Sequence, residues 1–143
     1  MASCVRTNAI GAYLTGSYFS PLLLASLKQT EFTPRVVNIT SGAGSITTRM
    51  TPNARGDELP HVPYRVSKAA MNMVSAIQFR EFDPQGIKVF LYGPGPTASR
   101  MNSRPGMKST AEGVAPVIDM LLGKRDGDAG VYLEHGHEGA FPW

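Results

Sequence analysis

The stretch Val36-Val37-Asn38-Ile39-Thr40-Ser41 has the pattern of a buried strand that ends in a hydroxyl side chain. Its apolar residues run almost without alternation, and Gly42-Ala43-Gly44 follows at once. A near-continuous apolar run is typical of a parallel strand that is covered on both faces. We therefore expect residues 35–41 to form a strand of a parallel sheet, with Ser41 at its carboxyl end.

Helical and strand patterns alternate along the rest of the 143 residues. Apolar side chains at helical spacing predict three helices, over residues 5–28, 63–82 and 111–122. Pro21 is expected to bend or break the first of them. Shorter apolar runs predict two further strands, over residues 87–92 and 130–133, and the remaining long stretches, 42–62 and 93–108, are expected to be loops. This alternation favours one α/β domain built on a parallel sheet with flanking helices.

Composition and charge argue against several classes of protein. Hydrophobic residues make up 42% and charged residues 17%, which is ordinary for a soluble globular protein. The net charge is +3, but the basic residues are scattered and only Lys124-Arg125 are adjacent, so we do not expect a nucleic-acid surface. The uncharged stretch from Ala9 to Leu27 is interrupted by Gly, Ser, Thr and Pro, so a half-buried helix is favoured over a membrane span or a secretion signal.

Cysteine and histidine give little further information about function. Cys4 is the only cysteine, which excludes an internal disulfide and fits a reducing compartment such as the cytoplasm. His135 and His137 could face the same side of a strand, but no third ligand is evident, and zinc usually takes three or four protein ligands. No metal site is expected.

Tyr64 and Lys68 are four residues apart at the start of the helix predicted over 63–82. This spacing places both side chains on one face of a helix. A nearby cation favours the phenolate and lowers the pKa of a tyrosine from about 10. Ser41 and Gly93-Pro94-Gly95 fall at the carboxyl ends of predicted strands, where ligands bind in open α/β sheets. Taken singly, each of these features also fits a solvated helix surface or a plain turn.

Taken together, four segments resemble the short-chain dehydrogenase/reductase family in their order and setting: Asn8-Ala9-Ile10-Gly11, Asn38-Ile39-Thr40-Ser41, Tyr64-x-x-x-Lys68 and Pro94-Gly95. Within the family the chain looks most like the C-factor and sniffer-like carbonyl reductases, whose chains also tend to end in Pro-Trp, here Pro142-Trp143. The resemblance implies that residues 1–143 form the carboxyl-terminal, catalytic portion of one domain, with a partial Rossmann-like parallel sheet. The family's glycine-rich turn and first strands have no counterpart here.

The resemblance also implies a role for each residue. Tyr64 would be the general acid or base, Lys68 would lower its pKa and bind the nicotinamide ribose, Ser41 would orient the substrate oxygen, and Asn8 would hold a water in the proton relay. Four residues would border the nicotinamide: Pro94, Gly95, Thr97 and Ser99. Residues 97–108 would lie where the family has a substrate lid. Ser45, nearer to Tyr64 in sequence, is a rival hydroxyl to Ser41.

The function implied is that of an NAD(P)-dependent oxidoreductase that interconverts a small-molecule carbonyl and an alcohol, with NADP slightly favoured. A homo-oligomer or an association with a related reductase is expected. The alternative is a non-catalytic interaction protein that associates with a full-length reductase, because the family helices matching residues 5–28 and 64–82 commonly pack across a subunit interface. A truncated gene product is a third reading. Since no strand precedes residues 35–41, we expect an exposed apolar edge that makes the chain associate or fold poorly.

Overall fold

The computed structural model describes residues 1–29, 31–52, 61–99 and 108–143. In this part of the chain, three parallel strands form one sheet in the order β1-β2-β3. The strands are β1 (Arg35–Ile39), β2 (Lys88–Gly93) and β3 (Tyr132–Glu134). Their register pairs Ile39 with Tyr92 and Gly93 with Glu134, so the carboxyl ends meet at one edge. The predicted parallel sheet is confirmed.

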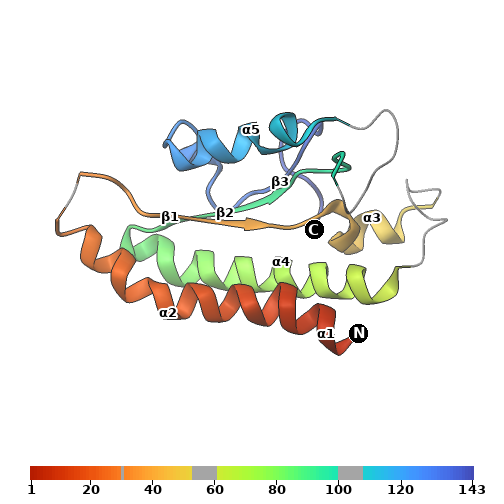
Figure 1. Ribbon diagram of the computed structural model, residues 1–143, viewed down its shortest axis with the longest axis horizontal. Coiled ribbons are helices and arrows are strands. Elements are labelled where there is room, and N and C mark those ends of the chain that lie inside the picture. Colours follow the sequence, from red (N-terminus) through yellow and green to blue (C-terminus); the bar gives the residue numbers. More distant parts are fainter. Residues whose placement is uncertain (30, 53–60, 100–107) are drawn as a thin grey trace.

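The helices cover both faces of this sheet (Figure 1). They are α1 (Ala2–Val5), α2 (Gly11–Ser26), α3 (Ile46–Met50), α4 (Val62–Phe82) and α5 (Thr110–Leu121). A π-helical turn, η1 (Arg6–Ile10), joins α1 to α2, and short 3₁₀ turns occur at η2 (Gly42–Gly44), η3 (Asp83–Gln85) and η4 (Asp126–Asp128). Helices α2 and α4 run side by side under one face, and α5 lies over the other (Figure 1). The α/β layering expected from the sequence is therefore confirmed.

Each face of the sheet has its own apolar cluster. Residues of β2 reach both: Val89 packs with Phe82 on the α2/α4 side, and Phe90 packs with Met120 on the α5 side. All four side chains are buried. Because helices bury both faces, successive residues of β2 from Val89 to Tyr92 are hydrophobic and buried on both sides of the strand.

A bend or a break is expected at Pro21, and the break is wrong. Helix α2 continues through Pro21, although proline cannot donate the backbone hydrogen bond to the carbonyl of Ser17. The Ser20 hydroxyl donates to that carbonyl instead, at 3.1 Å. The irregular turn lies upstream, at η1. None of the helices in the described residues is long and apolar enough to cross a membrane.

The loop predicted over residues 42–62 is wrong in its first part, and residues 53–60 lie outside the described part of the chain. Turn η2 and helix α3 occupy the start of it. Ser45 caps α3, because its hydroxyl accepts a hydrogen bond from the Thr48 backbone N–H at 3.0 Å. The β-branched side chains of Ile46, Thr47 and Thr48 lower helix propensity and hide this short helix from a pattern search.

The last strand lies slightly later than the predicted 130–133, because Gly130 adopts a positive φ of 79° and belongs to the preceding turn. Helix α5, predicted over 111–122, begins in a capping box. Here the Ser109 hydroxyl accepts from the Glu112 backbone N–H, and the Glu112 carboxylate accepts from the Ser109 backbone N–H.

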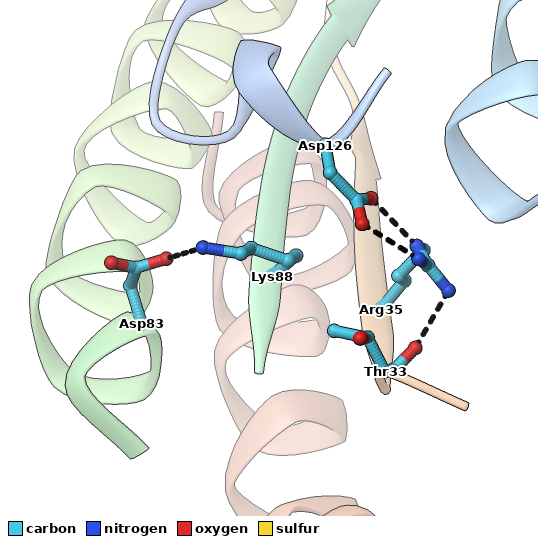
Figure 2. A network of polar contacts seen from close by, with 5 residues as sticks. All are labelled: Thr33, Arg35, Asp83, Lys88 and Asp126. Atoms are coloured by element: carbon cyan, nitrogen blue, oxygen red, sulfur yellow. Dashed lines mark hydrogen bonds and ion pairs between the residues drawn. The ribbon is translucent and has the colours of Figure 1, made fainter. Parts of the chain in front are cut away.

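Ion pairs fix the amino ends of β1 and β2 (Figure 2). The Arg35 guanidinium donates to both carboxylate oxygens of Asp126, at 2.9 and 2.8 Å, and to the Thr33 carbonyl at 2.7 Å. Lys88 donates to Asp83 at 2.8 Å. The hydrogen bond with Asp126 raises the pKa of Arg35, and the same bond holds the pKa of Asp126 below its usual range. These contacts anchor the strand starts, opposite the edge where the candidate site lies.

Candidate active site

Tyr64 and Lys68 lie one turn apart in the first two turns of α4. The Lys68 ammonium is 5.8 Å from the centre of the Tyr64 ring, within range of a cation–π contact. The Tyr64 side chain is 39% exposed, whereas Lys68 is half-buried. The pair therefore presents an accessible phenol beside a sheltered cation.

Lys68 is held against the end of β1. Its Nζ donates to the Ile39 carbonyl at 2.9 Å and approaches the Met71 sulfur at 3.6 Å. Burial lowers the pKa of Lys68. Because an edge-strand carbonyl fixes the ammonium, its position depends on both the helix and the sheet.

The turn that carries Ser41 packs closely on the backbone of α4. A Cβ on Gly44 would lie 2.7 Å from the Lys68 carbonyl carbon and 2.8 Å from the Ala69 nitrogen, so only glycine fits there. The Asn72 side-chain amide donates to the Gly44 carbonyl at 3.4 Å. The Ser41 hydroxyl accepts from the Ala43 backbone N–H at 3.2 Å and is half-buried. Ser41 is thus carried on a turn that contacts α4 at Lys68.

Asn8 lies in the π-helical turn η1, a type of irregularity that is frequent at functional sites. Its side-chain amide donates to the Ser67 hydroxyl at 2.9 Å, and that hydroxyl donates to the Tyr64 carbonyl at 2.7 Å. Asn8 and Tyr64 are therefore linked through Ser67, a fully buried residue to which the sequence analysis gave no role. The signal for it was its place three residues after Tyr64, where a hydroxyl can bond back to the helix.

An open cleft of about 370 Å³ follows the free edge of β1. It is lined by Asn8 and Lys68, by Val37, Asn38 and Ile39 of β1, and by Thr7, Gly11, Ala12, Thr15 and Met71. Asn8 and Lys68 therefore open into the same cleft.

The four residues expected to border a nicotinamide follow β2. Gly95 has a positive φ of 63°, and the Thr97 hydroxyl donates to its carbonyl at 3.1 Å. Thr97 also forms a parallel bridge with Lys108. Pro94, Gly95 and Thr97 are half-buried and Ser99 is exposed. Most of the expected lid, residues 100–107, lies outside the described residues.

Buried polar groups gather beneath Ser41. The Thr40 hydroxyl donates to the Asn72 side-chain oxygen, and Asn38, two residues earlier on β1, donates to the Gln78 side chain at 2.8 Å. Burial raises the pKa of the buried Tyr132 hydroxyl, and hydrogen bonding with the Asn72 and Thr40 side chains opposes that rise. The sequence did not predict these buried polar contacts, because each of the polar residues lies in a segment whose pattern is otherwise apolar.

The two histidines after β3 contact aromatic side chains. His135 Nδ1 lies 3.1 Å from the Tyr92 hydroxyl, and the His137 ring packs against Phe141 with ring centres 5.1 Å apart. Within the described residues, no group of three or more His, Cys, Asp or Glu side chains could hold a metal ion.

Comparison with known sequences finds two fungal relatives along nearly the whole chain. The short-chain dehydrogenase anuI of Penicillium roqueforti is 34% identical over 92% of this chain and 55% of its own length. The short-chain dehydrogenase/reductase tropE of Talaromyces stipitatus is 31% identical over 93% of this chain and 55% of its own. The chain thus spans about half the length of the curated relatives it matches. No family model matches the chain.

Solved structures share the fold. The carbonyl reductase Sniffer of Drosophila melanogaster superimposes on 97% of this chain with a TM-score of 0.77 and 20% identity. An NADPH-bound carbonyl reductase from chicken fatty liver gives the same coverage and TM-score at 24% identity. In these superpositions the chain covers 55% and 53% of the two proteins. Sequence relatives and shared fold agree, and the chain belongs to the short-chain dehydrogenase/reductase family.

Proposed function

We propose that this chain is the catalytic portion of an NAD(P)-dependent oxidoreductase that interconverts a small-molecule carbonyl and an alcohol. The observation that carries the proposal is the Tyr64–Lys68 pair. Its ammonium is 5.8 Å from the phenol ring and is held by the Ile39 carbonyl at the edge of the sheet. A phenol beside a fixed, half-buried cation is suited to proton transfer, because the cation stabilises the phenolate.

The residues present fit one end of a dinucleotide. The Lys68 ammonium opens into the cleft along β1, where it could donate to a ribose hydroxyl. Pro94, Gly95, Thr97 and Ser99 would border the nicotinamide, from the carboxyl end of β2. When bound, the cofactor supplies the hydride, and the protein supplies position and proton transfer. NADP is slightly favoured over NAD, through the resemblance to carbonyl reductases.

The described residues do not fit the phosphate end. A pyrophosphate usually rests on a glycine-rich turn that opens a helix. Gly42-Ala43-Gly44 is not such a turn, because Gly44 packs against the backbone of α4 at Lys68 and Ala69. We therefore expect residues 1–143 alone to bind a dinucleotide weakly. Hydride transfer at a normal rate by the purified 143-residue chain would overturn that expectation.

The proton step follows from the site's own groups. In reduction, Tyr64 donates its phenolic proton to the carbonyl oxygen, and Lys68 stabilises the phenolate that remains. Ser41 hydrogen-bonds the same oxygen and orients it. Ser45 is the weaker candidate, because its hydroxyl accepts from the Thr48 backbone N–H to cap α3, and its proton is already within reach of Thr48 Oγ1 and the Trp143 carbonyl. Asn8, which faces the same cleft as Lys68, would hold a water that returns a proton to the pair.

The test uses a chimera that joins residues 1–143 to the amino-terminal half of the Penicillium roqueforti relative. Oxidation of NADPH is followed with an aromatic aldehyde as the probe. Tyr64→Phe is expected to lower kcat by about 10²- to 10⁴-fold, the usual contribution of a general acid. Tyr18→Phe is the control, because Tyr18 is 77% exposed on α2 and should leave the rate unchanged. Full activity of Tyr64→Phe would refute the assignment.

A second function, a non-catalytic interaction protein, is favoured by the apolar side chains exposed on α2 and α4. Tyr18, Phe19 and Leu22 are 77%, 56% and 65% exposed on α2, and Met73 and Ile77 are 63% and 50% exposed on α4. Such a surface is typical of a protein-protein interface. The partner would be a related full-length reductase or a second copy of the chain.

Co-purification separates the two functions. If the chain is an interaction protein, it should bind the full-length Penicillium roqueforti relative in size-exclusion chromatography, and Leu22→Arg should abolish the complex. If the wild-type chain forms this complex and the chimera does not oxidise NADPH, the interaction protein is favoured. An active chimera with no complex would favour the enzyme.

A further inference from the structure

Glu134 ends β3 at the same sheet edge as Ser41 and Gly93. Its carboxyl group turns back across the neighbouring strands. A methyl group on Gly93 would overlap Glu134 Oε2, and one on Gly42 would lie 3.1 Å from Glu134 Oε1. The carboxyl group therefore fills the space left by two glycines, one next to Ser41 and one that opens the Pro94-Gly95 turn.

This carboxyl group is poorly satisfied. Glu134 Oε2 is buried and has no hydrogen-bond partner among the described residues. Burial raises the pKa of Glu134, and the Gly42 backbone N–H opposes that rise. An unpaired carboxylate is costly in such a place, so burial shifts the equilibrium of Glu134 towards its protonated form. A buried acid is thus built into the edge that carries the candidate active site.

The charged and titratable groups around Glu134 come from β2, from β3, and from the segments before α5 and after β3. Lys108, just before α5, and His137, after β3, both lower the pKa of Glu134. The carboxylate in turn raises the pKa of Tyr92 on β2 and of Tyr132 on β3. Lys108 and His137 thus oppose the effect of burial on Glu134, and the carboxylate disfavours ionisation of the two phenols.

We propose that Glu134 is a positioning residue, whose protonation state is coupled to the backbone of Ser41–Gly42 and of Gly93–Gly95. The carboxyl group touches the glycine of each segment, so a change in its charge moves or loosens both. Its consequence for catalysis rests on the proposed function, but the coupling itself does not. Glu134 acts through Ser41 and Gly95 rather than on the substrate.

The coupling is tested in the 143-residue chain by following backbone amide resonances against pH. The Gly42 and Gly93 amides should titrate together, with a midpoint above the ordinary range of a glutamate. Glu134→Gln keeps the shape of the side chain and should abolish this titration. Glu138→Gln removes an exposed carboxyl group four residues later and should leave it unchanged. Persistence of the titration in Glu134→Gln, or its absence in the wild type, would overturn the proposal.

A second variant tests the geometry without changing the charge. Gly93→Ala should push the carboxyl group out of its gap, so the midpoint should fall towards the ordinary range. An unchanged midpoint in Gly93→Ala would contradict the proposed contact.

The catalytic consequence is measured in the chimera. In the wild-type chimera, kcat should fall as Glu134 ionises. Glu134→Gln should match the wild-type kcat at low pH and should not show this fall, and its KM for NADPH should be unchanged. A residue with a merely structural role would change the melting temperature and leave the pH profile of kcat in place, which would overturn the positioning role. If the chimera is inactive with Tyr64 intact, the proposed function fails, while the amide titration still decides the coupling.

Discussion

The two ends of the same three strands are built in opposite ways. At the amino ends, Arg35 pairs with Asp126 through two hydrogen bonds and Lys88 pairs with Asp83. At the carboxyl ends, by contrast, Glu134 Oε2 is buried without a hydrogen-bond partner among the described residues. The amino ends pair their charges, whereas the carboxyl ends leave a carboxyl oxygen unsatisfied.

This difference separates the parts of the sheet that stabilise the fold from those suited to chemistry. Titratable groups whose pKa values are shifted by burial often mark functional sites, because catalytic acids and bases need pKa values matched to their task. Lys68, Tyr132 and Glu134 have shifted pKa values, each with burial as the largest cause, and all lie towards the carboxyl edge. Substitutions at the two ends should therefore have different signatures.

The largest effect on stability is expected from Gly44→Ala at the carboxyl end. The new Cβ would lie 2.7 to 2.9 Å from atoms of Lys68 and Ala69, most of them backbone, so α4 or the Ser41 turn must move. We expect a loss of about 2 to 3 kcal/mol in the free energy of unfolding, as for other overpacked sites. Urea denaturation monitored by circular dichroism measures it.

Gly127→Ala is the matched control at the amino end. A Cβ there meets nothing within 4 Å, so the change should stay within about 0.5 kcal/mol. Equal losses in the two variants would mean that the close approach of η2 to α4 does not matter for stability.

An intermediate effect is expected from Asp126→Asn. The Arg35 side chain is 13% exposed and that of Asp126 36%, so we expect a loss of about 1 kcal/mol at neutral pH. The pKa of Asp126 is lower in the folded chain than in the unfolded one, so its contribution is present above the unfolded pKa and disappears as the pH falls through the folded pKa. Thermal unfolding at several pH values should show the two proteins converging in acid.

Asp119→Asn provides the comparison, since its pair with Lys124 is 3.0 Å long and more exposed, at 44% and 64%. It should cost less than Asp126→Asn at neutral pH. A larger loss for Asp119→Asn would contradict the idea that the bidentate pair anchors β1.

The smallest effect on unfolding is expected from Ile39→Lys at the free edge of β1. Ile39 is 41% exposed, and its strand has no neighbour on that side within the described part of the sheet. A charge on an exposed edge strand discourages pairing with another chain. We expect the wild-type chain to associate in light scattering and Ile39→Lys to associate less.

Leu122→Lys adds the same charge at a site that is 64% exposed after α5, and should not change the association. A monomeric, cooperative melt of the wild-type chain would refute the edge prediction altogether.

Local pattern was enough to predict the parallel sheet, the three long helices and the Tyr64–Lys68 spacing. It failed where a local rule was overridden, as at Pro21, where the Ser20 hydroxyl replaces the missing donor. It also failed at α3, whose β-branched residues lower helix propensity although Ser45 caps the helix. Both errors have the same source, since propensity is a weak prior that specific hydrogen bonds override.

The order of apolar and polar residues already contained the α/β alternation and a tyrosine and a lysine on one helix face, because both depend on neighbours within a turn or a strand. It did not contain the link from Asn8 through Ser67 to Tyr64, or the pair between Arg35 and Asp126, which are 91 residues apart. It also did not reveal that the Glu134 carboxyl group lies over Gly93. Such contacts depend on strand register and on how the layers pack, so they exist only once the chain has folded.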